Sequence, residues 1–598
     1  MIHKRITYFL FFILFTGMFL LLLQRLRFPG SFIRLRYAGL CFLACSGLLV
    51  YIKLKSWNVF TDCYASVRKH IDFILRHEFA AGILLILIIM ILTRLPFYLY
   101  FRTPSLVPDT GSYFFPAELI MTGGGIPKFL IRLPGYPLFL AAVLSIGKTW
   151  INAVLFQSVM ALAGSIILLT GIYALFRRVT FFSAIALCIF MANSQTLSYE
   201  IHVLTESLYA SVIMAAYGFL FWGAGRNRRL AMIFSSGLMA YAVLIRPGGL
   251  FFIVIFLFIM GALILKKKIH LAISYLIPFP VCLFSVCVYN YFTAGIFALT
   301  FFGELSIALA TNSFWQQDVR YDPCVNQAIS TVSQLHTKYS DYSDQDRNII
   351  ENTWQLKEIY FIFQKIYNPS LGWATGTIFT NCFTHADLEN QRNLLKEISF
   401  DAIKKKPDTY IKFVLSNFWA YYLYNMHIKF DFYSLCLNLG RFYYLRSAPI
   451  SEYESRLYRE IYSSPIPKGY KIKHFSSSVS QIYLINNALI EIHKYIEWFV
   501  WRFFRRGFWT LLYFTVCGLT VVLCIQKGVN NISMLLFISL LLCPLGAGAV
   551  TCLVQPALER FSFPTQFIYY LAPSAGLSFF SFFFNKTGKN GMKNKWSA

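Results

Sequence analysis

Charged residues are scarce in this chain, and acidic residues are the scarcest. Only 14% of the 598 residues are charged, whereas 57% are hydrophobic. A soluble fold of this length would need more polar side chains to cover its surface, so the composition excludes a soluble globular protein. Apolar runs such as 153–175, 251–265 and 532–553 contain no charged residue. Several reach the roughly 20 residues that a helix needs to cross a membrane once flanking aromatic residues are counted.

Cysteine motifs and sequence repeats are also absent. The 13 cysteines form no CxxC motif and no cluster with histidine, so no zinc site is expected. Most lie inside apolar runs, and the polar part of the chain holds an odd number, Cys324, Cys382 and Cys436. This arrangement predicts no disulfide framework. Because no tandem repeat or low-complexity tract is present, a solenoid or a long disordered tail is excluded.

Basic residues outnumber acidic ones by 54 to 27, which gives a net charge of +27. They gather in short clusters between the apolar runs, as is typical of loops at an anionic cytoplasmic leaflet; nucleic-acid binding is the weaker interpretation. With the N-terminus inside, the cytoplasmic clusters are those at 53–69, 177–178, 226–229, 266–268 and 586–595. Loop 24–36 does not follow the positive-inside rule, because it carries four arginines and the same orientation places it outside. Residues 6–23 follow three basic positions and lack a small-residue cleavage site, which indicates an uncleaved signal anchor.

These patterns predict an all-α polytopic membrane protein with about 12 transmembrane helices and a mainly helical extracytoplasmic domain. The expected spans are 6–23, 37–53, 81–101, 151–175, 179–198, 203–223, 230–247, 249–265, 269–293, 508–526, 532–554 and 560–584. At 246–249 one bent hairpin or two short helices fit equally well. The chain then divides into a transmembrane hairpin with a cytoplasmic linker (1–80), a transmembrane core (81–294), an extracytoplasmic domain (295–507), C-terminal transmembrane helices (508–585) and a basic cytoplasmic tail (586–598). The core contains a first outer loop at 102–150, and the extracytoplasmic domain contains expected helices at 389–406 and 407–424.

The first outer loop holds the most informative segment. It turns at Pro108-Asp109, continues into an expected short helix at 112–121, and stops at the glycines 123–125. Lys128 and Arg132 follow, and the turn at 132–137 leads into an apolar helix at the membrane surface. One acid and two cations therefore lie together at the outer face. Glycosyl transfer from a lipid phosphate needs a carboxylate base for the acceptor hydroxyl and cations for the leaving phosphate.

Several short motifs, in order along residues 90–580, resemble those of the GT-C glycosyltransferases. Within these, the chain is similar to the bacterial branch related to protein O-mannosyltransferases and the lipid A aminoarabinose transferase. The motifs are Asp109-Thr110-Gly111-Ser112-Tyr113 with the downstream Ala117 and Gly123, Arg132-Leu133-Pro134-Gly135-Tyr136-Pro137, His202-Val203-Leu204-Thr205-Glu206-Ser207-Leu208, Leu244-Ile245-Arg246-Pro247-Gly248-Gly249, Tyr289-Asn290-Tyr291, 407–419 and Glu559-Arg560-Phe561. The resemblance implies an inverting transfer from a polyprenyl-phosphate sugar at the outer face of a bacterial cytoplasmic membrane, with no required cofactor or metal. It also implies that Asp109 is the general base, although Thr110 stands where many relatives have a second acid and Gly248 where an acid is usual.

Each site residue also has an ordinary structural interpretation. Asp109 fits a helix cap or a turn, and Tyr113 fits an interfacial aromatic position. Lys128 and Arg132 fit cations that extend to the headgroups. Glu206 complements a helix N-terminus, with His202 one turn earlier as a structural histidine or its hydrogen-bond partner.

Arg246 is expensive to bury among apolar runs unless it is paired, so we expect it to contact the lipid phosphate. Arg94 and Arg560 follow the same reasoning with less support. The expected donor-phosphate ligands are Arg132, Arg246 and Lys128, and the substrate-site candidates are Tyr113, Glu206 and His202.

The leading hypothesis is thus a membrane glycosyltransferase whose partners are a polyprenyl-linked sugar and a glycolipid, glycan or protein acceptor, without nucleic acid. A transporter or flippase of lipid-linked sugars is the first alternative, although no internal repeat is visible. A non-catalytic membrane assembly protein, with a partner bound by 295–507, is the second. A glycan polymerase or ligase is a nearer alternative within the same chemistry.

Overall fold

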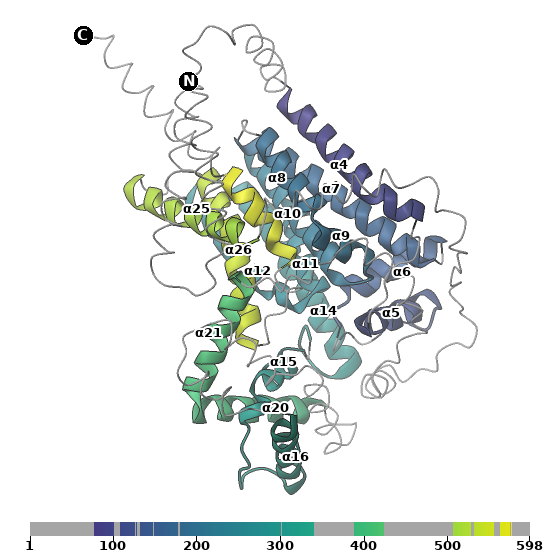
Figure 1. The fold of residues 1–598 in the computed structure, drawn as a ribbon, viewed down its shortest axis with the longest axis vertical. Helices are drawn as coiled ribbons and strands as arrows, with labels where there is room; N and C mark the ends of the chain where they lie inside the picture. The colour runs from purple at the N-terminus through teal and green to yellow at the C-terminus, as the bar shows by residue number, and fades with distance from the viewer. Residues whose placement is uncertain are drawn as a thin grey trace, which may run out of the picture. The chain divides into compact units, whose positions relative to one another are not determined.

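The computed structural model describes residues 77–100, 108–147, 149–176, 180–300, 302–339, 388–423, 506–527, 532–554, 563–574 and 576, apart from four positions between 126 and 131. The chain divides into two compact units, residues 1–81 with 576–598, and residues 82–575. Almost all of the described residues belong to the second unit, whose elements are helices (Figure 1). Spans expected at 6–23 and 37–53, and the basic tail, lie outside the described residues.

The described part of the second unit is a succession of helices. The α-helices are α4 (Glu78–Tyr100), α5 (Pro108–Met121), α6 (Gly135–Gly147), α7 (Trp150–Phe176), α8 (Thr180–Ala192), α9 (Ser194–Ile201), α10 (Thr205–Arg226), α11 (Arg229–Ile245), α12 (Phe252–Leu265), α13 (Ile269–Leu276), α14 (Pro278–Ala294), α15 (Phe302–Thr311), α16 (Pro323–Tyr339), α20 (Leu388–Lys405), α21 (Pro407–Leu423), α25 (Arg506–Lys527) and α26 (Ile532–Val554). Three 3₁₀ segments are η2 (Pro247–Phe251), η3 (Asn312–Phe314) and η5 (Phe563–Thr565). In the described part of the chain, six helices are long and apolar enough to cross a membrane, or seven if α8 and α9 count as one bent span. The protein therefore has the character of a multi-pass membrane protein.

The packing of α7 against α10 depends on glycines spaced seven residues apart. A Cβ atom at Gly171 would lie 2.2 Å from the carbonyl oxygen of Gly218, and one at Gly164 would lie 2.6 Å from that of Ser211. On α10, Gly225 meets the backbone of Ala174 in the same way, at 2.6 Å. Small residues let membrane helices approach until their backbones touch. The sequence of α7 and α10 thus creates a tight pair at the centre of the bundle.

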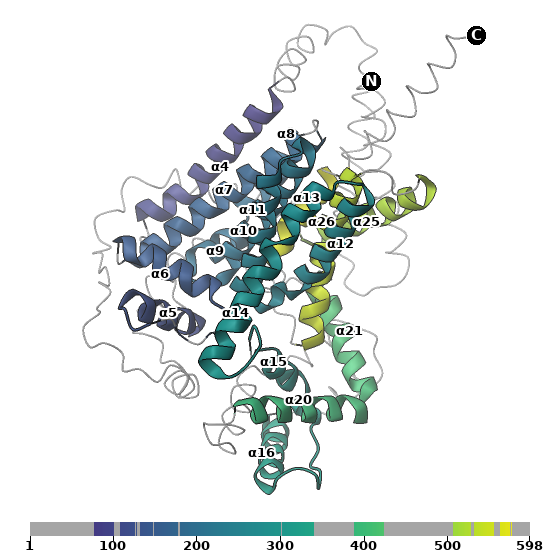
Figure 2. The same cartoon turned by 180° about the vertical axis from the view of Figure 1, so that it is seen from behind.

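A second group of helices surrounds η2. Figure 2 shows α11, α12, α13 and α14 together on the side of the bundle hidden in Figure 1. The side chain of Phe251, in η2, packs against Gly546 of α26, where an added Cβ atom would lie only 2.9 Å from the ring. At Tyr217, the hydroxyl donates to the carbonyl of Ser539 at 2.8 Å and joins α10 to α26. Elements far apart in the sequence therefore share one membrane-embedded core.

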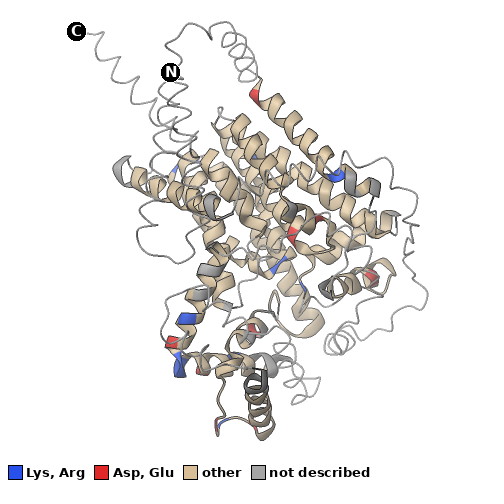
Figure 3. Cartoon of the chain, viewed as in Figure 1, with Lys and Arg blue, Asp and Glu red and all other residues tan. Residues whose placement is uncertain are grey.

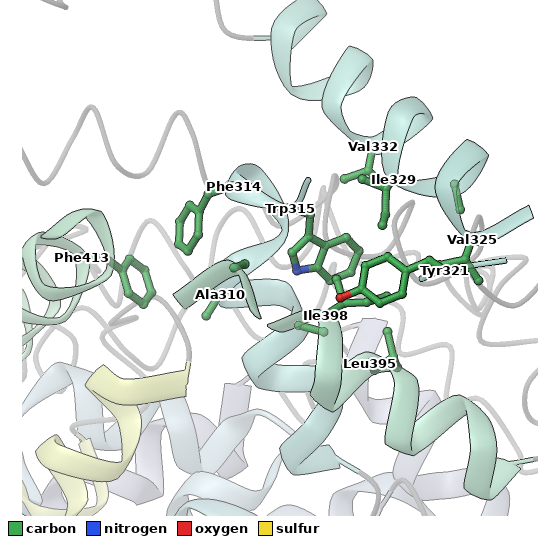
Figure 4. Packing of buried hydrophobic residues seen from close by; sticks show 13 residues of the cluster. Ala310, Phe314, Trp315, Tyr321, Val325, Ile329, Val332, Leu395, Ile398 and Phe413 are labelled. Atoms are coloured by element: carbon green, nitrogen blue, oxygen red, sulfur yellow. The ribbon is translucent and has the colours of Figure 1, made fainter. Parts of the chain in front are cut away.

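The polar region contributes its own small core. Buried side chains from α15, η3, α16, α20 and α21 pack together around Trp315, Tyr321 and Ile398 (Figure 4). On the surface of this cluster Arg320 contacts Asp318 and Asp401, and Lys405 contacts Asp318 at 3.3 Å. The hydrogen bond that Tyr321 donates to Asp401 is the main cause that lowers the pKa of this carboxyl group, and Arg320 lowers it further.

Most expected helices in the described residues are confirmed; two differ in extent, and one alternative that the sequence left open is decided. The span expected at 179–198 is broken at Asn193 into α8 and α9, bent by 60°, because the Asn193 side chain caps α9 by accepting from the backbone N–H of Gln195. At 246–249 the structure has two helices, since Arg246 is extended and η2 starts at Pro247. The helix expected at 112–121 begins four residues earlier, at Pro108, because a proline suits the first helical position. The count of about 12 spans and the GT-C architecture stay predictions.

Two basic loops lie side by side at one end of the bundle. Lys268 donates to the carbonyl of Ala224 at 3.1 Å, and the ring of His270 lies 2.9 Å from the side-chain oxygen of Asn227. The loop between α10 and α11 and the loop between α12 and α13 therefore share an end, with the arginines of 226–229 and the lysines of 266–268. Glu206, at the start of α10, and Arg246, after the end of α11, lie at the opposite end of these helices.

Candidate functional site

The site is built where four separate sequence motifs meet, at the end of the bundle away from the two basic loops. The first contact joins α5 to the segment before α10: the hydroxyl of Thr110 donates to the carbonyl of Val203 at 3.0 Å. Thr110 and Val203 are both buried. Asp109 precedes Thr110 in the first turn of α5, so its backbone lies beside the segment 202–204.

Arg132 fastens the turn before α6 to α5. Its Nε donates to the hydroxyl of Ser112 at 2.9 Å, and a terminal nitrogen donates to the hydroxyl of Tyr113 at 3.2 Å. The guanidinium also lies 4.6 Å from the centre of the Tyr113 ring, a cation–π distance. Tyr113 in turn packs edge-on against Tyr136 with ring centres 5.2 Å apart. Arg132 and Tyr113, proposed separately from the sequence, thus form one unit.

The start of α6 touches the end of α11. A Cβ atom at Gly135 would lie 2.7 Å from the carbonyl oxygen of Leu244 and from the backbone nitrogen of Ile245. The Tyr241 hydroxyl donates to the carbonyl of Gly135 at 2.9 Å. Only glycine permits this approach. The turn that carries Arg132 is therefore held directly against the residues that precede Arg246.

Arg246 and Glu206 form an ion pair at this junction. The guanidinium nitrogen lies 3.1 Å from the carboxylate oxygen, and the side chains are 12% and 2% exposed. Thr205 adds a donated hydrogen bond to the other carboxylate oxygen at 3.3 Å. A buried charge in a membrane protein persists when it is paired, and Glu206 is the protein partner of Arg246. The contact with a lipid phosphate that was expected of Arg246 stays a prediction. Figure 3 shows that charged residues are rare within the bundle as a whole.

His202 lies beside this pair but bonds elsewhere. Its Nδ1 is 2.5 Å from the carbonyl oxygen of Ser198. Because a carbonyl can only accept, Nδ1 carries the hydrogen. Burial lowers the pKa of His202, against the opposing effects of this hydrogen bond and of Glu206. Of the two interpretations of His202, the structural histidine fits, since its Nδ1 bonds to the end of α9 while Arg246 and Thr205 contact Glu206.

Gln157, on α7, holds the 200–202 segment in position. Its amide nitrogen donates to the carbonyls of Glu200 and His202 at 2.7 and 3.0 Å, and its oxygen accepts from the hydroxyl of Tyr136 at 2.7 Å. Gln157 and Tyr136 are fully buried. Sequence reasoning missed Gln157; the available signal was an uncharged polar side chain inside an apolar helix, where its hydrogen-bonding groups must find partners.

Arg94 has a different role from the one its sequence position suggested. Its guanidinium bonds both carboxylate oxygens of Glu200, and Ser158 donates to the same carboxylate at 2.9 Å. Another nitrogen donates to the carbonyl of Met191. The expectation that Arg94 would contact a phosphate is therefore replaced by a structural assignment: it ties α4 to the bent pair α8 and α9. Glu200 was not singled out from the sequence.

Three sequence candidates lie wholly or partly outside the described residues. For Asp109 the structure describes only the backbone, in α5, and Lys128 and Arg560 lie outside the described residues. Glu118, the other acid of the loop, is half-buried, and burial raises its pKa. Among the described residues no group of His, Cys, Asp and Glu side chains has the arrangement of a metal site.

Sequence reasoning found no basis for a disulfide at Cys324, at the start of α16. Cys324 is disulfide-bonded, whereas the other described cysteines are free, so its partner lies outside the described residues.

Comparison of the chain with family models, with curated proteins and with solved structures finds no match. The class that the fold defines is therefore a multi-pass helical membrane protein, and its activity is argued from the site itself.

Proposed function

We propose that this protein is a membrane glycosyltransferase that moves a sugar from a polyprenyl-phosphate donor to an extracytoplasmic acceptor with inversion. The observation that carries the proposal is the meeting of α5, the 132–137 turn, the 202–206 segment and the 244–249 segment. These are the stretches that resemble the conserved motifs of GT-C enzymes, and contacts between Thr110 and Val203, Gly135 and Ile245, and Arg246 and Glu206 join them.

The chemistry of the proposed transfer assigns a separate role to each charged group. Asp109 removes the proton of the acceptor hydroxyl as it attacks the anomeric carbon. Arg246, with Arg132 and Lys128 in support, stabilises the charge that develops on the departing lipid phosphate. Glu206 keeps Arg246 in place before the donor binds. Tyr113 positions Arg132 through the ring contact and the hydrogen bond described above.

Two observations support an extracytoplasmic site. The basic loops 226–229 and 266–268 lie together at the end of α10–α13 opposite to Glu206 and Arg246, and the positive-inside rule places such loops in the cytoplasm. Disulfides persist in oxidising compartments, and Cys324 belongs to the helical cluster that follows α14. Both arguments favour the outer face for the site, in the cytoplasmic membrane of a bacterium.

A matched pair of aspartates tests the proposal. Asp109 and Asp408 each follow a proline in the first turn of a helix, α5 or α21. Full-length protein in liposomes would be given radiolabelled polyprenyl-phosphate sugars and membrane extracts as acceptors. Removal of a general base lowers rates by about 10²–10⁴-fold, so Asp109→Asn should abolish transfer, while Asp408→Asn should stay within about twofold of wild type. Full transfer by Asp109→Asn would remove the base assignment.

The acceptor and the sugar are identified by the complementary experiment. Lipid-linked sugars and surface glycans of cells with and without the protein would be compared by mass spectrometry. Loss of one glycan together with accumulation of its lipid-linked donor supports transfer. An unchanged glycan profile with unchanged donor lipid would contradict it.

One observation favours a second candidate, a transporter of lipid-linked sugars. The bent pair α8 and α9 is an interrupted apolar helix beside the buried ion pair of Arg94 and Glu200, and transporters build substrate sites from such breaks. Movement of a fluorescent polyprenyl-phosphate sugar across liposomes without any sugar transfer would favour this candidate. Transfer activity that survives in detergent, where no transmembrane gradient exists, would favour the enzyme.

A further inference from the structure

The exposed surface formed by the end of α20, Lys406 and the outer face of α21 combines lysines with apolar side chains at the end of a candidate membrane span. Lys404, Lys406 and Lys412 are exposed, and Ile411 and Leu415 are 56% and 53% exposed. Residues 408, 411, 412 and 415 share one side of the helix because their spacing follows its period. The opposite side is buried, with Phe413 inside the cluster shown in Figure 4.

Hydrogen bonds place α21 against the last turns of α26. The hydroxyl of Tyr410 donates to the carbonyl of Leu553 at 2.6 Å, and that of Tyr422 donates to the carbonyl of Pro544 at 2.8 Å. The two helices therefore run in opposite directions. Tyr422 fits closely because α26 has a glycine there: a Cβ atom at Gly548 would lie 2.2 Å from the tyrosine hydroxyl. The second half of α21 thus lies beside a helix that is apolar enough to span a membrane.

The depth of the lysines follows from this register. The candidate span Ile532–Leu553 has 22 residues, about 33 Å at 1.5 Å per residue, which matches a hydrocarbon core of about 30 Å. Leu553 then marks the boundary of the core. Because α21 runs antiparallel to α26, residues after Tyr410 lie deeper in the core and residues before it lie further out. Lys406 lies about 6 Å outward from Tyr410, in the headgroup layer. Lys412 lies about 3 Å inward, next to Ile411, and its long side chain extends back to the headgroups, while Leu415 lies about 8 Å inward, at the level of the acyl chains.

We propose that this surface, made by the end of α20, Lys406 and the outer face of α21, binds anionic phospholipids, with the phosphates on Lys404, Lys406 and Lys412 and the acyl chains on Ile411 and Leu415. Charge complementarity favours this occupant, because the exposed charged residues described between 404 and 415 are four lysines and one acid, Asp408. Lys405 takes no part, since it contacts Asp318. The interaction anchors the extracytoplasmic helices to the membrane and does not depend on the transfer reaction proposed above.

Site-specific photocrosslinking tests the lipid and its chemistry. A photoreactive phenylalanine analogue at position 415 of the full-length protein would be irradiated in liposomes of equal parts anionic and zwitterionic phospholipid, and the adducts identified by mass spectrometry. Each lysine at an anionic surface contributes a factor of about five in binding, so anionic adducts should exceed zwitterionic ones by at least about fivefold. Equal adducts, or adducts with only protein, would overturn the proposal.

Variants separate charge from structure. Lys404→Gln with Lys406→Gln and Lys412→Gln should bring the adduct ratio to about one, while the matched triple arginine variant should keep the excess. Lys396→Gln, at an exposed lysine of α20 about 13 Å along the helix from Lys405, is the control and should leave the ratio unchanged. An excess that survives the glutamine variant would also contradict the proposal.

Discussion

Breaking the Arg94–Glu200 pair should destabilise the bundle far more than removing both charges. The pair is almost fully buried, with side chains 6% and 2% exposed, and Glu200 accepts from Arg94 through both oxygens and from Ser158. Glu200→Gln leaves the guanidinium in an apolar surrounding without a counter-charge. Truncating one partner of a buried pair costs about 3–5 kcal/mol, whereas apolar replacement of both is often nearly neutral.

The magnitude is measured as a double-mutant cycle. Wild type, Arg94→Met, Glu200→Leu and the double variant would be purified in detergent and unfolded with sodium dodecyl sulfate, with helical content followed by circular dichroism. Each single change should cost about 3 kcal/mol or more, and the double change less than either, which gives a coupling energy of at least about 3 kcal/mol. Glu397→Gln, at an exposed acid of α20, should remain within about 0.5 kcal/mol of wild type. If the two single costs simply add in the double variant, the pair does not hold α4 to α9 and the reasoning fails.

Three further outcomes follow from the geometry. Gly135→Ala should lower the stability by about 1–3 kcal/mol and reduce sugar transfer, because the added Cβ would lie 2.7 Å from the Leu244 carbonyl. Gly248→Ala is the control and should change the stability little, because its Cβ would have no neighbour within 4 Å. Equal melting temperatures of the two variants would contradict the contact at Gly135. Gly171→Ala should separate α7 from α10 and lower the melting temperature by several degrees, with Gly261→Ala on α12 as its unhindered control. Burial holds the pKa of His202 in the folded protein below 6.5, so the contribution of the neutral ring to stability is complete above pH 6.5 and is lost as the pH falls through the folded pKa. The melting temperature should therefore decline less between pH 8 and pH 5 in His202→Gln than in wild type. An identical decline in both proteins would refute this cause.

Helix ends were predictable where a local residue enforces them. The chain leaves α5 at the glycines 123–125, and Gly123 and Gly125 have φ values of 75° and 99°, which other residues rarely adopt. The boundary between α20 and α21 falls at Pro407, within one residue of its expected place. The break at Asn193 was missed because an asparagine cap inside an apolar run changes the hydrophobic pattern little.

The partners of buried charges were not predictable in the same way. Arg94 and Arg246 occupy similar sequence contexts, each beside an apolar run and close to a proline, and the same role was expected of both. Their partners, Glu200 and Glu206, lie on neighbouring segments of the chain and differ by six positions. Which arginine meets which acid depends on how α4 and α11 pack against α9 and α10.

Composition and periodicity alone determined that this chain enters a membrane as a series of helices, because the energy of placing apolar side chains and backbone hydrogen bonds in lipid depends on local sequence. The tertiary structure decided which side chains meet at the junction of α5, α6, α10 and α11, and which arginine only holds helices together. Those contacts join residues from tens to about a hundred positions apart, and they form through the close approach of backbones at Gly135 and between α7 and α10. Such approaches are properties of two surfaces at once, so they arise only when the helices pack.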